Sequence, residues 1–317
     1  MNSRQFSELF TLQGAYPELQ QLVSLRKYTQ QFSLDTVLRT SPSAGNWQSR
    51  MRGRGLDFAE VRLYQPADDI RSIDWRVTAK TQKTHTRLFT QERERPVILA
   101  ADLRSAMFFG STQCFKAVSC AAIMSALAWI ALQSKDRVGG LVLGDNTHME
   151  LRPKASRKVV LSFIRYLDTY CQQLKSPIPN GSVQSLDQLL MKLNRVARPG
   201  SAVYLASDFH DIATLNIGRL AKLSQHSQVT LIMISDPLEW QLPTHKNLWV
   251  SDGLQMSELN KASRCEHILA QRTAKLHSIC DPLNIEILAV STNDNLLSVL
   301  QQRFAGDSKR AKSRSPT

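Results

Sequence analysis

The sequence lacks the features that mark several large classes of protein. No stretch reaches the roughly 20 apolar residues of a membrane helix, and the longest apolar run, residues 117–132, is alanine-rich and contains two serines. The five cysteines are odd in number and form no CxxC pair, which excludes the usual zinc and thioredoxin-like sites. The first residues, MNSRQFSELF, contain no apolar core of a signal peptide. These absences predict a cytoplasmic protein without a transmembrane segment, in a compartment where thiols stay reduced.

Signatures of common enzymes are also missing. The seven histidines form no HExxH pair, and no serine stands in a G-x-S-x-G context. The glycines of the RMRGRG run at residues 50–55 have neither the dinucleotide-binding nor the P-loop spacing. These motifs therefore indicate neither a hydrolase nor a nucleotide site, and no organic cofactor is expected.

Acidic residues are in short supply. Lys and Arg number 40 against 27 Asp and Glu, which gives a net charge of +13. Such a balance favours acidic partners, and the alternative is a solvated basic surface. A nucleic-acid or anionic-surface binding protein is thus an alternative function. Basic residues of the segment 46–95 alternate with acidic ones, however, which argues against a continuous phosphate track and against specific nucleic-acid binding.

Composition divides the chain into four segments. Residues 1–45 carry one amphipathic helical pattern, and residues 46–95 form a charged, β-containing arm or subdomain. Residues 96–305 read as a large α/β domain, and residues 306–317 as a disordered basic tail. Whether residues 1–95 fold independently stays open at this stage.

Apolar strands alternate with helices through the large domain. This alternation predicts a doubly wound, mainly parallel sheet covered by helices on both faces. We expect strands over 97–101, 138–143, 149–151, 202–206, 229–234 and 285–290, and helices over 112–133, 156–171, 185–197, 212–224, 258–280 and from 293.

Two aspartates follow predicted core strands. Asp102 ends the first strand and Asp208 follows a middle one. Ligands of such sheets bind at the carboxyl ends of strands where the strand order reverses. If these two strands flank that point, the carboxylates share one crevice, as in a magnesium site. The alternative is that both aspartates are helix N-caps. A magnesium-dependent phosphohydrolase would need further ligands and a general base that the sequence does not offer.

Several strings resemble a known bacterial family. SRMRGRGLDFAEVRLYQPADDIRSIDWRVTAKT looks like the signature of domain-of-unknown-function family 58, and DLRSAMFFG, KDRVGGLVLGD, ASDFHD and ISDPLEWQLP fit that family in the same order. The resemblance implies a von Willebrand factor A-like fold from about Pro96, preceded by a small β-containing region. It also implies a non-enzymatic protein-interaction role beside a MoxR-type AAA+ ATPase and other A-like domain proteins, in a chaperone-like system that assembles or activates complexes.

In A-like domains, the metal site combines a D-x-S-x-S string, a threonine and a later aspartate. Asp102 and Asp208 match the two aspartates, but Arg104 and Ala106 stand at the serine positions, and no threonine matches. The resemblance therefore implies a degenerate site with weak magnesium binding at most. We hypothesise that Arg104 forms a bidentate ion pair with Asp102 or Asp208 and replaces the metal.

The charged string before the large domain is a second candidate region. Its aspartates and arginines are expected to pair with one another, and its tryptophan to anchor a core or an interface. The string forms either a structural latch or a partner surface, through Arg52, Arg54, Asp57, Tyr64, Asp68, Asp69, Arg71, Asp74 and Trp75.

Overall fold

The structure is a computed structural model that divides the chain into two compact units. The main unit comprises residues 1–40 and 95–317, and the arm comprises residues 41–94. The described residues are 12–34, 56–65, 70, 73–91, 95–174, 184–240, 248–251, 256–259 and 262–304. The predicted tail, residues 306–317, lies outside them.

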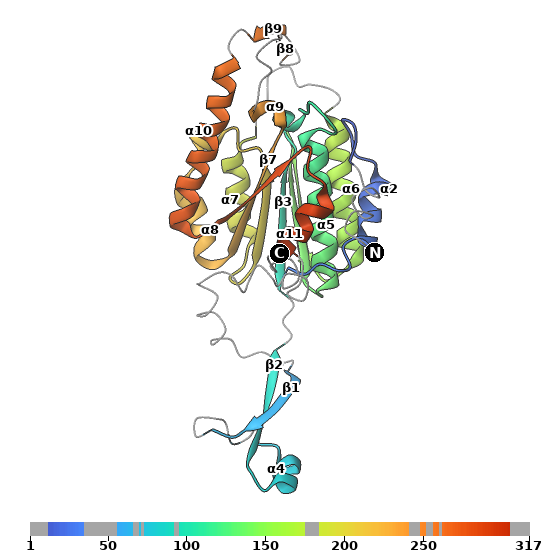
Figure 1. Ribbon diagram of the computed structural model, residues 1–317, viewed down its shortest axis with the longest axis vertical. Coiled ribbons are helices and arrows are strands. Elements are labelled where there is room, and N and C mark those ends of the chain that lie inside the picture. The colour runs from blue at the N-terminus through green and yellow to red at the C-terminus, as the bar shows by residue number, and fades with distance from the viewer. Residues whose placement is uncertain are drawn as a thin grey trace, which may run out of the picture. The chain divides into compact units, whose positions relative to one another are not determined.

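A six-stranded sheet in the order β10-β7-β6-β3-β4-β5 is the centre of the main unit (Figure 1). Every neighbouring pair is parallel except β4 and β5, which are antiparallel. The prediction of a mainly parallel α/β sheet is therefore confirmed. The strands are β3 (Pro96–Asp102), β4 (Arg137–Leu143), β5 (His148–Lys154), β6 (Ala202–Ser207), β7 (Gln228–Ser235) and β10 (Glu286–Ser291).

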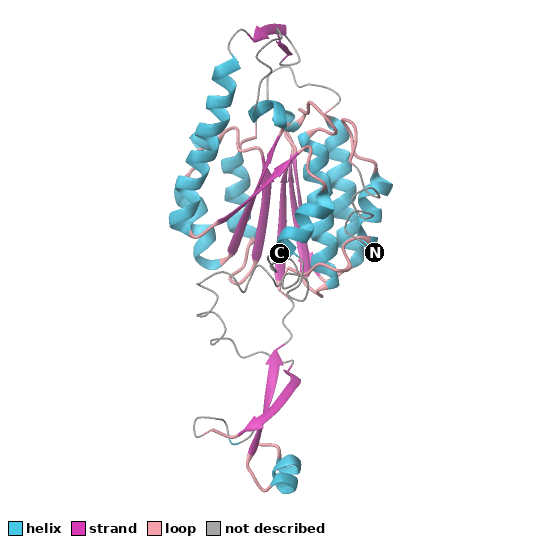
Figure 2. Cartoon of the chain, viewed as in Figure 1, coloured by secondary structure: helices cyan, strands magenta, loops and turns pink. Residues whose placement is uncertain are grey.

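Helices cover both faces of this sheet (Figures 1 and 2). Along β3, Val97, Leu99 and Ala101 join one buried cluster, whereas Ile98 and Ala100 join a second cluster on the other face. This explains why the strand reads as a continuous apolar run. The first face is covered by α2 (Leu19–Ser24), α5 (Lys116–Gln133), α6 (Arg157–Gln173) and α11 (Leu296–Phe304), and the second by α7 (Leu186–Val196), α8 (Ile217–His226) and α10 (Ala262–Cys280).

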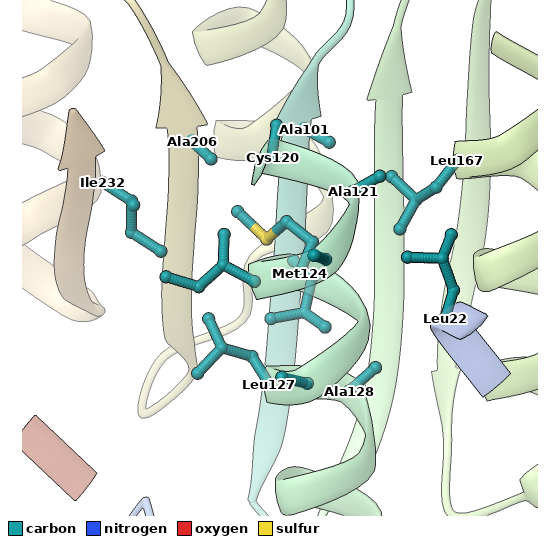
Figure 3. Packing of buried hydrophobic residues seen from close by; sticks show 14 of the residues in the cluster. Leu22, Ala101, Cys120, Ala121, Met124, Leu127, Ala128, Leu167, Ala206 and Ile232 are labelled. Atoms are coloured by element: carbon teal, nitrogen blue, oxygen red, sulfur yellow. The ribbon is translucent and has the colours of Figure 1, made fainter. Parts of the chain in front are cut away.

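Helix α5 is the core helix of the first face. Met124 and Leu127 project toward β6 and β7, next to Ala206 and Ile232 (Figure 3). Its frequent alanines let the sheet and neighbouring helices approach closely. Among the described residues, α5 is the one helix long and apolar enough to cross a membrane, and 89% of it is buried inside the fold.

The N-terminal segment belongs to the same core. Leu22 in α2 and Leu25 in the short 3-10 helix η1 (Leu25–Lys27) are fully buried. Gly14 pairs with Cys114 in an isolated parallel bridge that fixes the segment to the loop before α5. Apolar residues of the amphipathic pattern around residues 16–28 therefore lie on α2 and η1 and face the core.

The arm contains an antiparallel hairpin and one short helix. β1 (Leu56–Leu63) pairs with β2 (His85–Gln91), and α4 (Trp75–Thr81) lies between them in sequence. The Asp74 carboxylate caps α4 by accepting hydrogen bonds from the amides of Arg76 and Val77.

Several predicted elements differ from the structure. The helix expected over 258–280 begins at Ala262, because β9 (Met256–Leu259) pairs with β8 (Leu248–Ser251) as a hairpin. The Asp-Gly pair at 252–253 was the overlooked turn signal. The helix expected over 212–224 is divided into η5 (Ile212–Thr214) and α8. The arm helix α4 was not predicted.

Candidate functional site

The two aspartates predicted to share a crevice follow neighbouring strands. β3 lies between β4 and β6. After β3 the chain adds β4 and β5 on one side of it, and then β6, β7 and β10 on the other, so the strand order reverses between β3 and β6. Asp102 is the last residue of β3, and Asp208 directly follows β6. The Ser207 hydroxyl donates a hydrogen bond of 2.7 Å to Asp102 Oδ2, which links the two strand ends. The sequence argument for a shared edge is therefore confirmed.

Arg104 forms the bidentate ion pair with Asp102 that the sequence suggested. Its Nε lies 2.8 Å from Asp102 Oδ1, and its Nη2 lies 2.7 Å from Oδ2. Asp102 is fully buried, and the Arg104 side chain is almost so. The ion pair with Asp208, the other option, does not form, because Arg104 turns toward Asp211 instead.

The guanidinium of Arg104 holds Asp211 at the same time. Nη1 donates to Asp211 Oδ2 at 2.9 Å and to the Gln184 carbonyl at 3.2 Å. Asp211 Oδ2 also accepts the amide of Leu186, which fixes the start of α7. Burial alone would lower the pKa of Arg104, but hydrogen bonds and charge from Asp102 and Asp211 outweigh it, and the pKa is raised.

A second buried cation neutralises Asp208. Lys116 Nζ lies 2.9 Å from Asp208 Oδ2 and 3.1 Å from Glu239 Oε1. Lys116 was not predicted from the sequence. Its signal is visible in retrospect: it is the lone charge of an otherwise uncharged apolar helix. Burial favours the neutral amine, yet the two carboxylates reverse that effect and raise the pKa of Lys116.

His210 is an exposed residue beside Asp208 at this edge of the sheet. Its Nδ1 lies 2.9 Å from Asp208 Oδ1, and its amide donates to the same oxygen. This hydrogen bond to Asp208 raises the pKa of His210. Burial would raise the pKa of Asp208, but His210 and Lys116 dominate and hold it well below its usual range.

A further carboxylate at this edge, Asp236 after β7, was not predicted. It is fully buried and accepts hydrogen bonds from the hydroxyls of Ser111 and Thr292, and from two backbone amides. Asp236 therefore connects the loop before α5 to the loop between β10 and α11.

The side-chain oxygens of this edge do not fit a magnesium site. Arg104 and Ser207 already occupy both carboxylate oxygens of Asp102, and Lys116 and His210 occupy those of Asp208. Magnesium requires near-octahedral oxygen ligands, which these partners displace. Within the described part of the chain, no group of three or more His, Cys, Asp or Glu side chains could hold a metal ion.

Neither candidate aspartate caps a helix, so that alternative is wrong. The Asp102 and Asp208 carboxylates accept the amides two residues ahead, in local turns. The N-cap residue of α5 is Phe115, which makes no side-chain capping bond. Ala106 precedes the buried Met107 in the 3-10 helix η4 (Ser105–Met107), with no hydroxyl to contribute.

The charged string of the arm is only partly described. Arg52, Arg54, Asp68, Asp69 and Arg71 lie outside the described residues, and so does the side chain of Asp57 on β1.

Three residues of that string, Tyr64, Asp74 and Trp75, have side chains that the structure describes, and they differ in burial. Tyr64 is half-buried, and its amide donates to the Thr84 carbonyl. Asp74 is the α4 cap, and Trp75 is 67% exposed. Trp75 is therefore not a core residue in the structure, and its role at an interface stays a prediction.

Comparisons with known proteins give one family model and several uncharacterized relatives. The model of the protein family of unknown function DUF58 matches residues 60–268. An uncharacterized protein of Mycobacterium tuberculosis, Rv1480, is 27% identical over 238 residues, which cover 75% of this chain and 71% of that protein. The uncharacterized protein Mb1516 of Mycobacterium bovis matches to the same extent.

Proposed function

The chain belongs to the DUF58 family, and we propose that it is a cytoplasmic, non-enzymatic protein-interaction module with a von Willebrand factor A-like main unit. In this proposal it is the partner of a MoxR-type AAA+ ATPase, in a chaperone-like system that assembles or activates other complexes. The interaction does not use a metal ion.

The observation that carries the proposal is the pair of internal cations at the carboxyl edge of the sheet. Arg104 neutralises Asp102, and Lys116 neutralises Asp208. A carboxylate in such a pair is a poor general base, because proton binding would first have to break the ion pair. The ion pairs thus hold the carboxyl edge of the sheet rigid, as a support for side chains that contact a partner.

The rim of this edge offers side chains that a partner protein can contact. Asp211 and Glu239 are partly exposed while still tied to the internal cations. Trp240 in α9 (Pro237–Trp240) is 42% exposed, and its indole nitrogen donates to the Ser235 hydroxyl. Tryptophan residues are enriched among the strongest contacts of protein interfaces.

The test is calorimetric titration of this protein with a MoxR-type ATPase of the same organism. We expect binding of equal affinity in magnesium and in EDTA, and equal affinity for Asp102→Asn, provided that the variant is folded. Magnesium alone should not bind more tightly than about 1 mM. Binding that requires both magnesium and Asp102 would overturn the metal-independent mechanism, and no binding between folded proteins would overturn the partnership.

A further inference from the structure

Helix α4 of the arm is well anchored yet buries none of its side chains. Its first turn is capped by Asp74, whose amide donates to the His85 carbonyl of β2. The amide of His85 in turn donates to the Thr78 hydroxyl. These bonds fix α4 on the hairpin through its backbone and polar groups, so its apolar side chains remain available.

Exposed apolar side chains are concentrated in the arm. Three of the six large hydrophobic residues that are exposed in the described part of the chain are Leu63, Ile70 and Trp75, all within residues 41–94. Trp75 is the most exposed of the six. Burying an indole removes well over 100 Å² of surface from water, so covering Trp75 would contribute favourably to the binding of a partner.

The two charged residues of α4 itself, Arg76 and Lys80, are both basic. Among the arm side chains that the structure describes, the exposed charged ones are all basic: Arg76, Lys80 and Lys83. Arg76 and Lys80 are four residues apart, so they lie on one side of α4. Trp75 and Ala79 have the same spacing and form an apolar stripe beside them.

We propose that α4 is a docking element for an acidic face of a partner protein, with Trp75 entering an apolar pocket and Arg76 and Lys80 pairing with carboxylates around it. The inference rests on the proposed role as a protein-interaction module and adds the surface and the chemistry of its partner. A central aromatic anchor ringed by charge is the usual layout of a protein interface.

The charge of the chain argues against a second copy as the occupant. Residues 41–94 contain 10 Lys and Arg and 7 Asp and Glu, so the rest of the chain has 40 − 10 = 30 basic and 27 − 7 = 20 acidic residues. Two copies would therefore bring basic surfaces together. A nucleic acid fits less well than a protein, because Leu63 and Ile70 offer apolar surface that phosphates do not use.

Photocross-linking in the native cell tests the proposal directly. The photoreactive residue benzoylphenylalanine replaces Trp75 in the full-length protein, and a matched variant carries it at Met191, an exposed apolar position of α7. We expect an adduct specific to position 75, whose sequenced peptide comes from another protein and is rich in Asp and Glu. An adduct with nucleic acid or this chain itself, or none beyond that of position 191, overturns the proposal.

Binding to the purified ATPase separates this inference from the proposed function. If the wild type binds, Trp75→Ala should weaken binding about 10- to 30-fold, while Met191→Ala changes it less than about 2-fold. Equal binding of Trp75→Ala and wild type overturns the docking role of α4 and leaves the partnership intact. If the wild type does not bind, the ATPase partnership fails, and the cross-linked peptide still decides the role of α4.

Discussion

Arg104 neutralises Asp102 in a place from which water is excluded. Replacing Arg104 by methionine would leave a buried carboxylate without a counter-charge. We expect Arg104→Met to lower the free energy of unfolding by about 3–5 kcal/mol, measured by urea denaturation. Arg104→Met combined with Asp102→Asn should recover much of the loss, because the fully buried Asp102 charge is then absent and only Asp211, whose side chain is 17% exposed, lacks its partner.

A surface ion pair provides the matched control. Arg195 pairs with Glu150, but its side chain is 70% exposed. Arg195→Met should change the free energy of unfolding by less than about 1 kcal/mol. Equal effects of the two arginine substitutions would show that the Arg104 pair does not stabilise the fold.

Asp208 makes the free energy of unfolding depend on pH in the acidic range. Its pKa is lowered in the folded protein, so its contribution is fully present above the unfolded value near pH 4 and is lost as the pH falls. We expect the free energy of unfolding to decrease from pH 5 to pH 2, and Asp208→Asn to decrease less steeply. Parallel curves for the two proteins, measured by urea denaturation at each pH, would contradict this reading of the Lys116–Asp208 pair.

At the residue scale, the sequence predicted only part of the site. Asp102 and Asp208 could be found because apolar strands end at them, and Arg104 because it replaces a serine of a familiar pattern. Lys116 and Asp236 had comparable signals that were not used, a lone charge in an apolar helix and a position directly after an apolar strand. Their partners could not be derived, because loops bring those partners to the edge. Those loops follow no periodic pattern from which their geometry could be derived.

At the element scale, β4 packs unusually closely against α6. A Cβ added at Gly140 would overlap the ring of Phe163, which is fully buried. We expect Gly140→Ala to destabilise the protein by about 1–3 kcal/mol through overpacking, measured as a shift in the urea midpoint.

Gly218 offers the same substitution at an uncrowded site. It lies in the exposed first turn of α8, where an added Cβ meets only Asn216 Oδ1, at 3.2 Å. Alanine is the better helix former by up to about 1 kcal/mol, so Gly218→Ala should be neutral or stabilising. A Gly140→Ala protein as stable as the wild type would show that Phe163 can move aside.

The strands of the large sheet could be predicted from their burial, whereas the short elements outside it could not. Strands such as β3 and β6 are buried on both faces, so their apolar runs are visible in the sequence. Helix α4 and the β8–β9 hairpin are short and carry no such periodicity. The arm helix in particular is defined by the Asp74 cap rather than by a buried face.

For the whole molecule, the two ends of residues 1–94 play different structural roles. Leu22 and Leu25 complete the core around α5, whereas residues 41–94 form a compact unit of their own. Leu22→Ala should therefore cost about 2–5 kcal/mol in free energy of unfolding. It should also lower the thermal midpoint of the main unit.

Removing the arm should have the opposite outcome. A protein in which residues 41–94 are replaced by a flexible Gly-Ser linker of about 12 residues should unfold cooperatively, with a thermal midpoint within a few degrees of the wild type. The described residues of the buried clusters all belong to the main unit, so we expect their packing to survive removal of the arm. Differential scanning calorimetry of the arm-less protein, with Leu22→Ala as the destabilised reference, measures both effects. An arm-less protein that fails to fold would show that residues 41–94 are part of the main core, and the docking role of α4 would then have to be reconciled with a structural one.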